Sequence, residues 1–276
     1  ARPAGRLTPH TREGLTTTSE QFHFNALTIF LLAALIVISV LVRVSLLDYR
    51  TDDFRNHVHW QRYIDNNGGW LALGKQFSPY NVPYVYLLAL SRYLPLNDIY
   101  AVKLVSVIFD YVAAFWVYQL IKLRYRSKVF PWVGFLAVVF APTVILNASM
   151  WGQFDSTHVS FLLGSLYFLV RLAETPVANR GRSRWYGAFA LAFFTLAMAF
   201  KLQSSFFVLP ILFLLVSRRI PWYIWLVVPV LYLLVLLPSN LLGTPWLDLL
   251  SVYVKQLDLH KDLVVGGATA YVFLHN

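Results

Sequence analysis

Two adjacent acids, Asp52 and Asp53, are the first candidates for catalytic residues. They follow the first long apolar run, and a carboxylate at such a boundary can act as a general base toward a hydroxyl group. His57, His59 and Trp60 follow on the same predicted helix, and aromatic rings suit both a membrane interface and a sugar ring. The alternative is that both acids are solvated loop residues or helix caps, because a helical-looking segment follows them.

A lysine between two apolar runs, Lys201, is the second candidate. An ammonium group there needs water, a counter-ion or a phosphate to offset its desolvation. Gln203 and Asp155 are predicted on the same side of the membrane. We therefore favour a phosphate or counter-ion role over the alternative, a lysine whose stem snorkels at the end of a helix.

Three more charged residues fall within or beside apolar runs. Asp110 lies in the body of a run, where acids are usually paired or functional, and Lys103 precedes it by two helical turns on nearly the same face. We predict a structural ion-pair partner for Asp110. Arg43, near the outer end of the first run, is expected to snorkel toward the lipid headgroups.

Several kinds of site are not indicated. The histidines have no metal-ligand spacing and the chain has no cysteine, so we predict no metal ion and no cofactor. The sequence has no Gly-x-Ser-x-Gly elbow, no glycine-rich phosphate loop and nothing that resembles a nucleic-acid-binding motif.

The elements that must position these residues are membrane helices. Of 276 residues, 58% are hydrophobic and 13% are charged, whereas soluble domains usually have about 25% charged residues. The predicted fold class is all-α: a polytopic membrane protein with about seven transmembrane helices. The apolar runs are Ala26–Leu47, Ile99–Ile121, Phe130–Leu146, Thr157–Leu172, Trp185–Phe200, Ser204–Val216 and Pro221–Pro238.

The basic residues orient this layout. The formal net charge is +10, and the strongly basic connections fall in the cytoplasm if the aromatic segment Tyr80–Leu94 lies in the interface without crossing. That segment contains Pro83 and has only about fifteen residues, too few for a usual span. Asp48–Asp98 is then a long external loop with interfacial helices, and the polar candidates converge on the outer side.

The predicted layout has three parts. Residues 1–25 are a cytoplasmic N-terminal tail, residues 26–238 are the seven-helix module with external loop 48–98, and residues 239–276 are an external loop and the start of a further apolar segment. Because the chain begins with Ala1 and ends inside that apolar tendency, we expect the natural protein to continue beyond Asn276.

Four short motifs in order resemble the GT-C membrane glycosyltransferases, an all-helical superfamily. They are Asp53-Phe-Arg-Asn-His-Val-His-Trp60, Ser78-Pro-Tyr-Asn-Val-Pro-Tyr-Val-Tyr86, Trp151-Gly-Gln-Phe-Asp-Ser156 and Phe200-Lys-Leu-Gln203. The sequence is most similar to the glucosyltransferases that use dolichyl-phosphate-glucose, and to bacterial proteins related to the second GPI mannosyltransferase. The resemblance implies a seven-helix module whose first external loop carries a catalytic aspartate.

This resemblance implies a role for each candidate. Asp53 is the catalytic base, because the superfamily places its acid directly before an aromatic residue, and Asp52 is the reserve candidate. The donor is a sugar on a polyprenyl phosphate, and Lys201, Gln203 and His260 are expected to bind its phosphate. The residues expected to bind substrate are His59, Trp60, Trp151, Gln153 and Asp155.

We interpret the chain as an inverting glycosyltransferase that moves a hexose from a polyprenyl-phosphate-linked donor to a lipid-linked or other glycan acceptor. Its surroundings are membrane lipids, with no nucleic-acid partner. The likeness to bacterial members favours a bacterial plasma membrane over the endoplasmic reticulum, with the active site on the extracytoplasmic side. Two alternatives stay open: a lipid or solute transporter whose pathway Asp110 and Lys201 line, and a non-catalytic scaffold subunit that retains the fold.

Overall fold

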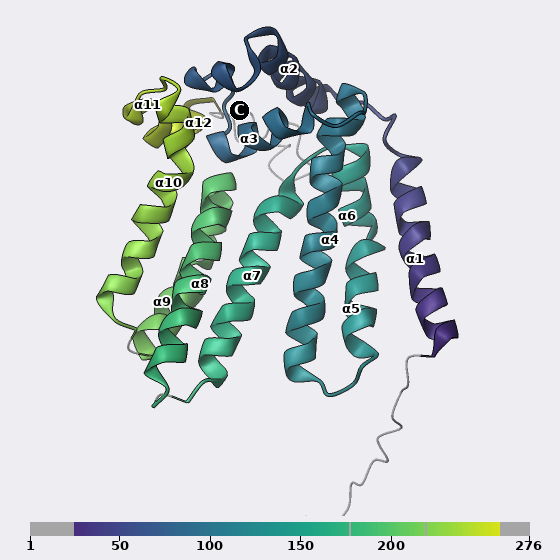
Figure 1. Ribbon diagram of the computed structural model, residues 1–276, viewed down its shortest axis with the longest axis vertical. Helices are drawn as coiled ribbons and strands as arrows, with labels where there is room; N and C mark the ends of the chain where they lie inside the picture. Colours follow the sequence, from purple (N-terminus) through teal and green to yellow (C-terminus); the bar gives the residue numbers. More distant parts are fainter. Residues whose placement is uncertain (1–24, 177, 219, 260–276) are drawn as a thin grey trace, which may run out of the picture.

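A computed structural model describes residues 25–176, 178–218 and 220–259, and within these ranges every regular element is a helix (Figure 1). The long helices run roughly parallel and form the body of the molecule. They are α1 (Ala26–Val44), α4 (Asp98–Arg124), α5 (Phe130–Val139), α7 (Asp155–Glu174), α8 (Arg180–Phe200), α9 (Val208–Ser217) and α10 (Val227–Leu241).

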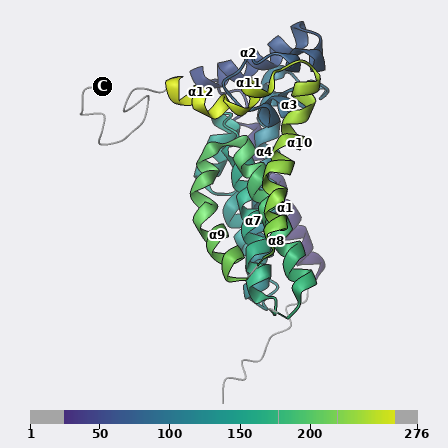
Figure 2. The same ribbon diagram turned by 90° about the vertical axis from the view of Figure 1, so that its left-hand side faces the viewer.

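Shorter helices cover one end of this body, at the top of Figure 1. We call them the cap: α2 (Asp52–Asn66), the 3₁₀ helix η1 (Gly69–Gly74), α3 (Val82–Ser91), α11 (Trp246–Leu250) and α12 (Val252–Leu259). Figure 2, turned by 90°, shows α11 and α12 at the same end of the molecule as α2. The end of α4 and the start of α8, where basic residues cluster, lie at the opposite end (Figure 1).

The membrane class is confirmed, but the structure does not confirm seven spans. Among the residues that the structure describes, four helices are long and apolar enough to cross a membrane: α1, α4, α7 and the continuous stretch Trp222–Leu241, which joins the 3₁₀ helix η4 (Trp222–Leu226) to α10. A fifth span would be the pair Phe130–Val139 and Pro142–Met150, which bends by 45°. Helix α8 starts with a run of arginines, and Leu202–Ser217 is short, so neither has the length and composition of the others.

Helix α3, the helical part of the segment Tyr80–Leu94, lies in the cap and is buried in the protein, and it is too short to be a candidate span. The Asn81 side chain accepts a hydrogen bond from the Val82 amide at 2.9 Å and begins the helix, and Pro83 occupies its first turn. Most of its side chains are buried, and the helix packs against α2, α4, α8 and α10. Its apolar character therefore serves the protein core.

The bent span is broken at Pro142. Proline lacks an amide hydrogen and disfavours helical backbone at the preceding residue, and Ala141 is accordingly extended (φ −61°, ψ 121°). The chain continues as α6 (Pro142–Ile145) and the π-helix η2 (Leu146–Met150). A break at this depth frees backbone carbonyls that need donors from elsewhere in the protein, because lipid offers none.

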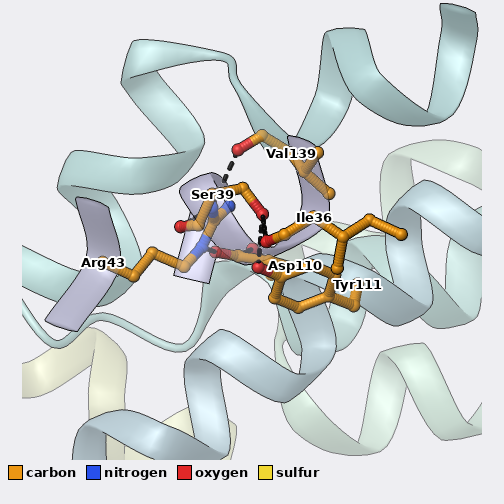
Figure 3. A network of polar contacts seen from close by, with 7 residues as sticks. Ile36, Ser39, Arg43, Asp110, Tyr111 and Val139 are labelled. Atoms are coloured by element: carbon orange, nitrogen blue, oxygen red, sulfur yellow. Dashed lines mark hydrogen bonds and ion pairs between the residues drawn. The ribbon is translucent and has the colours of Figure 1, made fainter. Parts of the chain in front are cut away.

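Arg43 supplies one of the donors that these carbonyls need. The prediction that its side chain snorkels toward the lipid headgroups is therefore wrong. The residue is only 1% exposed. Its Nη1 donates to the Val139 carbonyl at 2.8 Å, and its Nε lies 3.2 Å from Asp110 Oδ2 (Figure 3). The guanidinium therefore turns inward because the end of α5 and a buried carboxylate both offer it acceptors. Asp110 does have an ion-pair partner, but it is Arg43.

Lys103, the partner predicted for Asp110, binds backbone carbonyls instead. Its Nζ lies 2.9 Å from the Leu47 oxygen and 2.6 Å from the Tyr49 oxygen, just beyond α1. It also lies 2.8 Å from the Ser149 oxygen and 3.0 Å from the Met150 oxygen, where η2 ends. One buried ammonium thus joins the chain after α1 to the end of the broken span.

Gly152 allows α2 to pack directly on the segment after η2. Its φ is +68°, a left-handed conformation that a side chain disfavours. A Cβ atom there would collide with the ring of Phe54, which is buried in the first turn of α2.

The substitution Gly152→Ala should therefore destabilise the protein by about 1–3 kcal/mol, from backbone strain and displacement of the Phe54 ring. The control is Gly181→Ala in α8, where an added Cβ meets no atom within 4 Å and alanine favours the helix. Thermal unfolding of both purified variants, followed by circular dichroism, should show a lower midpoint for Gly152→Ala only. Equal midpoints would contradict this account of Gly152.

Candidate active site

Lys201 follows the last residue of α8, where the chain turns into the 3₁₀ helix η3 (Leu202–Phe207). The final carbonyls of α8 are bound from the cap. The Tyr253 hydroxyl lies 2.6 Å from the Met198 oxygen and 3.0 Å from the Ala199 oxygen, and the Asn81 amide donates to the Ala199 oxygen at 2.9 Å. These bonds fix the point at which Lys201 leaves the helix. Burial raises the pKa of Tyr253 above its usual value, so the phenol stays a hydrogen-bond donor.

Lys201 and Asp155 meet as an ion pair between their Nζ and Oδ1 atoms. Asp155 is the first residue of α7, and its other oxygen, Oδ2, accepts a hydrogen bond from the Asn147 amide at 3.1 Å. The Lys201 ammonium also lies 5.4 Å from the centre of the Phe154 ring. The side chains of Lys201 and Asp155 are 18% and 38% exposed, so the pair is partly desolvated yet open to solvent.

A hollow of about 420 Å³ opens beside this pair, and we call it the Lys201 hollow. It is formed where the cap meets the end of α8. Its polar and aromatic lining includes Asn56 and Trp60 of α2, Tyr80, Lys201, Gln203, Tyr253 and Gln256. The structure therefore brings Trp60, Lys201 and Gln203, which were predicted from separate motifs, to one place.

An aromatic cluster holds α2 over this hollow. His57 is buried, and its Nδ1 is hydrogen-bonded to the Tyr84 hydroxyl of α3. The Tyr84 and Phe154 rings stack with centroids 3.7 Å apart, and Trp60 meets Tyr80 edge to face at 5.4 Å. Such ring pairs stabilise a fold beyond the burial of their apolar surface. They fix α2 against α3 and against the residue that precedes Asp155.

Of three predicted site residues, the structure describes two by their backbones alone and does not describe the third. The backbones of Asp52 and Asp53 form the first turn of α2, whose N-cap is Thr51, and their side chains lie outside the described part. His260 lies outside the described residues altogether. Within the described residues, no group of three histidine, aspartate or glutamate side chains could hold a metal ion.

The other predicted substrate-binding residues are more dispersed. His59 faces a different hollow, of about 540 Å³, with Arg50, Arg55 and Arg62. Trp151 is 53% exposed, and its carbonyl oxygen lies 3.5 Å from the Thr51 hydroxyl. Gln153 is half-buried, and its backbone N–H donates to the backbone carbonyl of Asn147 at 3.0 Å. None of these three lines the Lys201 hollow among the residues the structure describes.

A family model for dolichyl-phosphate-mannose-protein mannosyltransferases matches residues 82–247, more than half of the chain. The chain belongs to this family. Membership in the mannosyltransferase family makes it a membrane glycosyltransferase of the GT-C superfamily and confirms the resemblance seen in the motifs. No curated protein and no solved structure matches the chain.

The region shared with the mannosyltransferase family contains Asp155, Lys201 and Gln203 but not α2. The family match therefore covers the side of the hollow that carries Lys201 but not the side formed by α2. The Lys201 side lies in the family match, whereas Asn56 and Trp60 enter the hollow through the packing of α2.

The sequence did not indicate several residues of this candidate site. Asn147 binds Asp155, and Tyr253 and Asn81 bind the end of α8. Asn81 lies within a quoted motif and Asn147 lies four residues before another, so the sequence around both gave some indication of the site. The sequence around Tyr253 and Gln256 gave no such indication, because it is the packing of α12 against the end of α8 that brings them to the hollow.

The substitution Tyr253→Phe should loosen α12 while preserving the fold, because it removes a buried hydrogen bond worth about 1 kcal/mol. Hydrogen exchange of the α12 amides should then speed up by about fivefold. Tyr49→Phe is the control, since Tyr49 is 56% exposed. If both variants exchange at the wild-type rate, Tyr253 does not hold the cap.

Proposed function

We propose that the protein is an inverting glycosyltransferase that moves a hexose from a polyprenyl-phosphate-linked donor to an extracytoplasmic acceptor, either lipid-linked or another glycan. The observation that carries the proposal is the Lys201 hollow, where one face of α2 meets Lys201 and Gln203. The match to the mannosyltransferase family supports the class of reaction.

The proposed general base is Asp53. Helical spacing puts position 53 on the face of Asn56 and Trp60, three and seven residues further on, and both of these line the Lys201 hollow. Position 52 shares a face with Arg55 and His59, which line the other hollow, and with Asn56, which lines both hollows. The shared face with Trp60 therefore favours Asp53 over Asp52.

The proposed reaction needs one base and one anion-binding group. An acceptor hydroxyl oxygen forms a bond to the anomeric carbon, the bond from that carbon to the phosphate oxygen breaks, and the hydroxyl proton passes to Asp53. The electron pair of the broken bond stays on the leaving polyprenyl phosphate. The ammonium of Lys201 stabilises that charge, and Gln203 offers an amide donor beside it.

We also propose that α8 and α9 cross the membrane with the other long helices, which gives seven spans. Both run alongside α7 and α10 in Figure 1. Basic residues at the end of α4 and the start of α8 lie opposite the cap, and the positive-inside rule would put that end in the cytoplasm. The Lys201 hollow then faces the extracytoplasmic side.

The transporter alternative is less well supported. It would use Asp110 and Lys201 as parts of a polar pathway through the bundle. Asp110 is instead fully buried and bonded to Arg43 and Ser156, and Lys201 lies at the edge of the cap. The accessible polar side chains beside Lys201 lie where the cap meets the end of α8.

The substitution Asp53→Asn should lower kcat by about 10²- to 10⁴-fold, the usual contribution of a general base. A radiolabelled polyprenyl-phosphate-sugar transfer assay on purified protein measures it. Two controls come from the same helix: Asp52→Asn, and Asp65→Asn, whose acid is paired with Arg92 at 2.6 Å. Both should retain activity within about tenfold. Full activity of Asp53→Asn, or loss in Asp52→Asn alone, would remove Asp53 from the reaction.

The substitution Lys201→Gln should raise the donor KM by about 10- to 100-fold, because a charge-assisted bond to the donor phosphate is lost. Lys201→Arg should recover part of the affinity. Lys122→Gln, an exposed lysine at the opposite end of the bundle, is the matched control. An unchanged donor KM in Lys201→Gln would show that the phosphate binds elsewhere.

A further inference from the structure

Polar contacts lead from the buried Arg43–Asp110 pair to Ser156, the residue that follows Asp155 in the chain. Asp110 of α4 accepts a hydrogen bond from the Ser156 hydroxyl at 2.5 Å through Oδ1, and one from Arg43 through Oδ2. Ser156 directly follows Asp155 in the first turn of α7. The carboxylate that pairs with Lys201 is therefore one residue from a side chain held by a buried acid.

Asp110 is itself fixed from several sides. Arg43 donates to the carbonyls of Val139 at 2.8 Å and of Ser39 at 3.2 Å, and its guanidinium lies 5.1 Å from the centre of the Tyr111 ring. The Ser39 hydroxyl lies 2.7 Å from the Tyr111 hydroxyl (Figure 3). Because Arg43 and Asp110 are at most 1% exposed, water cannot replace these partners.

We propose that Ser156 is a positioning residue for donor binding, and that it acts through Asp110 and Arg43. The bond from Ser156 to Asp110 fixes the first turn of α7, and with it the place of the Asp155 carboxylate. Asp155 in turn holds the Lys201 ammonium at the edge of the hollow. This inference rests on the proposed function, because it assigns the network to the site where the donor phosphate is proposed to bind.

The contact can be removed without leaving a buried charge unpaired. Ser156→Ala deletes one hydroxyl and keeps the Arg43–Asp110 pair, whereas a change at Asp110 or Arg43 would leave its partner uncompensated. Ser156→Thr keeps a hydroxyl and should rescue. Ser160→Ala is the matched control: the Ser160 hydroxyl is buried one turn further along α7 and bonds only the Thr157 carbonyl at 2.7 Å among the contacts of the described residues.

The measurement is the dissociation constant of farnesyl phosphate, a short analogue of the leaving lipid, by calorimetry on the full chain in phosphatidylcholine nanodiscs. Ser156→Ala should bind about tenfold more weakly, the effect expected for one lost bond to a charged group. Ser156→Thr and Ser160→Ala should remain within about twofold of wild type. If Ser156→Ala does not fold, Ser156→Cys, a poor donor of similar size, replaces it.

Combining Ser156→Ala with Lys201→Gln separates this inference from the proposed function. If Ser156 acts through the Lys201–Asp155 pair, its substitution should have no further effect once Lys201 is gone. Additive effects, or wild-type binding by Ser156→Ala while Lys201→Gln binds weakly, would overturn the role of Ser156 alone. Wild-type binding by Lys201→Gln would overturn the proposed phosphate site and, with it, this inference.

Discussion

The structure depends on satisfying the carbonyls that the broken span exposes. Within lipid every backbone polar group needs a partner from the protein, and the break at Pro142 leaves the ends of α5 and η2 without their helical donors. Two buried cations supply them. Arg43 of α1 binds the Val139 oxygen, and Lys103 of α4 binds the oxygens of Ser149 and Met150. These carbonyls of the irregular backbone are thereby hydrogen-bonded within the protein.

That constraint determines the geometry of the candidate site. Because η2 ends at fixed carbonyls, Gly152 can turn with positive φ and let Phe54 pack against it. The same Lys103 ammonium lies 4.9 Å from the centre of the Phe54 ring. The start of α2 and the start of α7 are therefore positioned by one rigid segment. The acid proposed as base and the acid that pairs with Lys201 begin these two helices.

The helices could be predicted from the sequence, whereas the hydrogen-bond partners of the buried charges could not. Each predicted apolar run corresponds to one helix or to consecutive helical segments, because hydrophobicity over such lengths depends on local composition. Among the described residues, four or five helical stretches have the length and composition of a span instead of the seven predicted, because α8 carries arginines at its start and Leu202–Ser217 is short. The predicted roles of Arg43 and Lys103 were wrong because most of their acceptors are backbone oxygens, which every residue has and no motif marks. The meeting of Lys201 with Asp155 could be anticipated because the predicted topology put both on one side.

The resting ion pair bears on how the site would select its ligand. With Lys201 neutralised by Asp155, a neutral lipid gains little electrostatic energy from the hollow, whereas a phosphate can replace the carboxylate as the partner of the ammonium. Such an exchange is feasible only if the displaced carboxylate keeps a donor, since an unpaired acid in a partly dry site is costly. The Asn147 amide already binds its second oxygen at 3.1 Å. The broken span that carries Asn147 thus makes Lys201 available without leaving Asp155 unsatisfied, which is a physical reason for an irregular segment at this place.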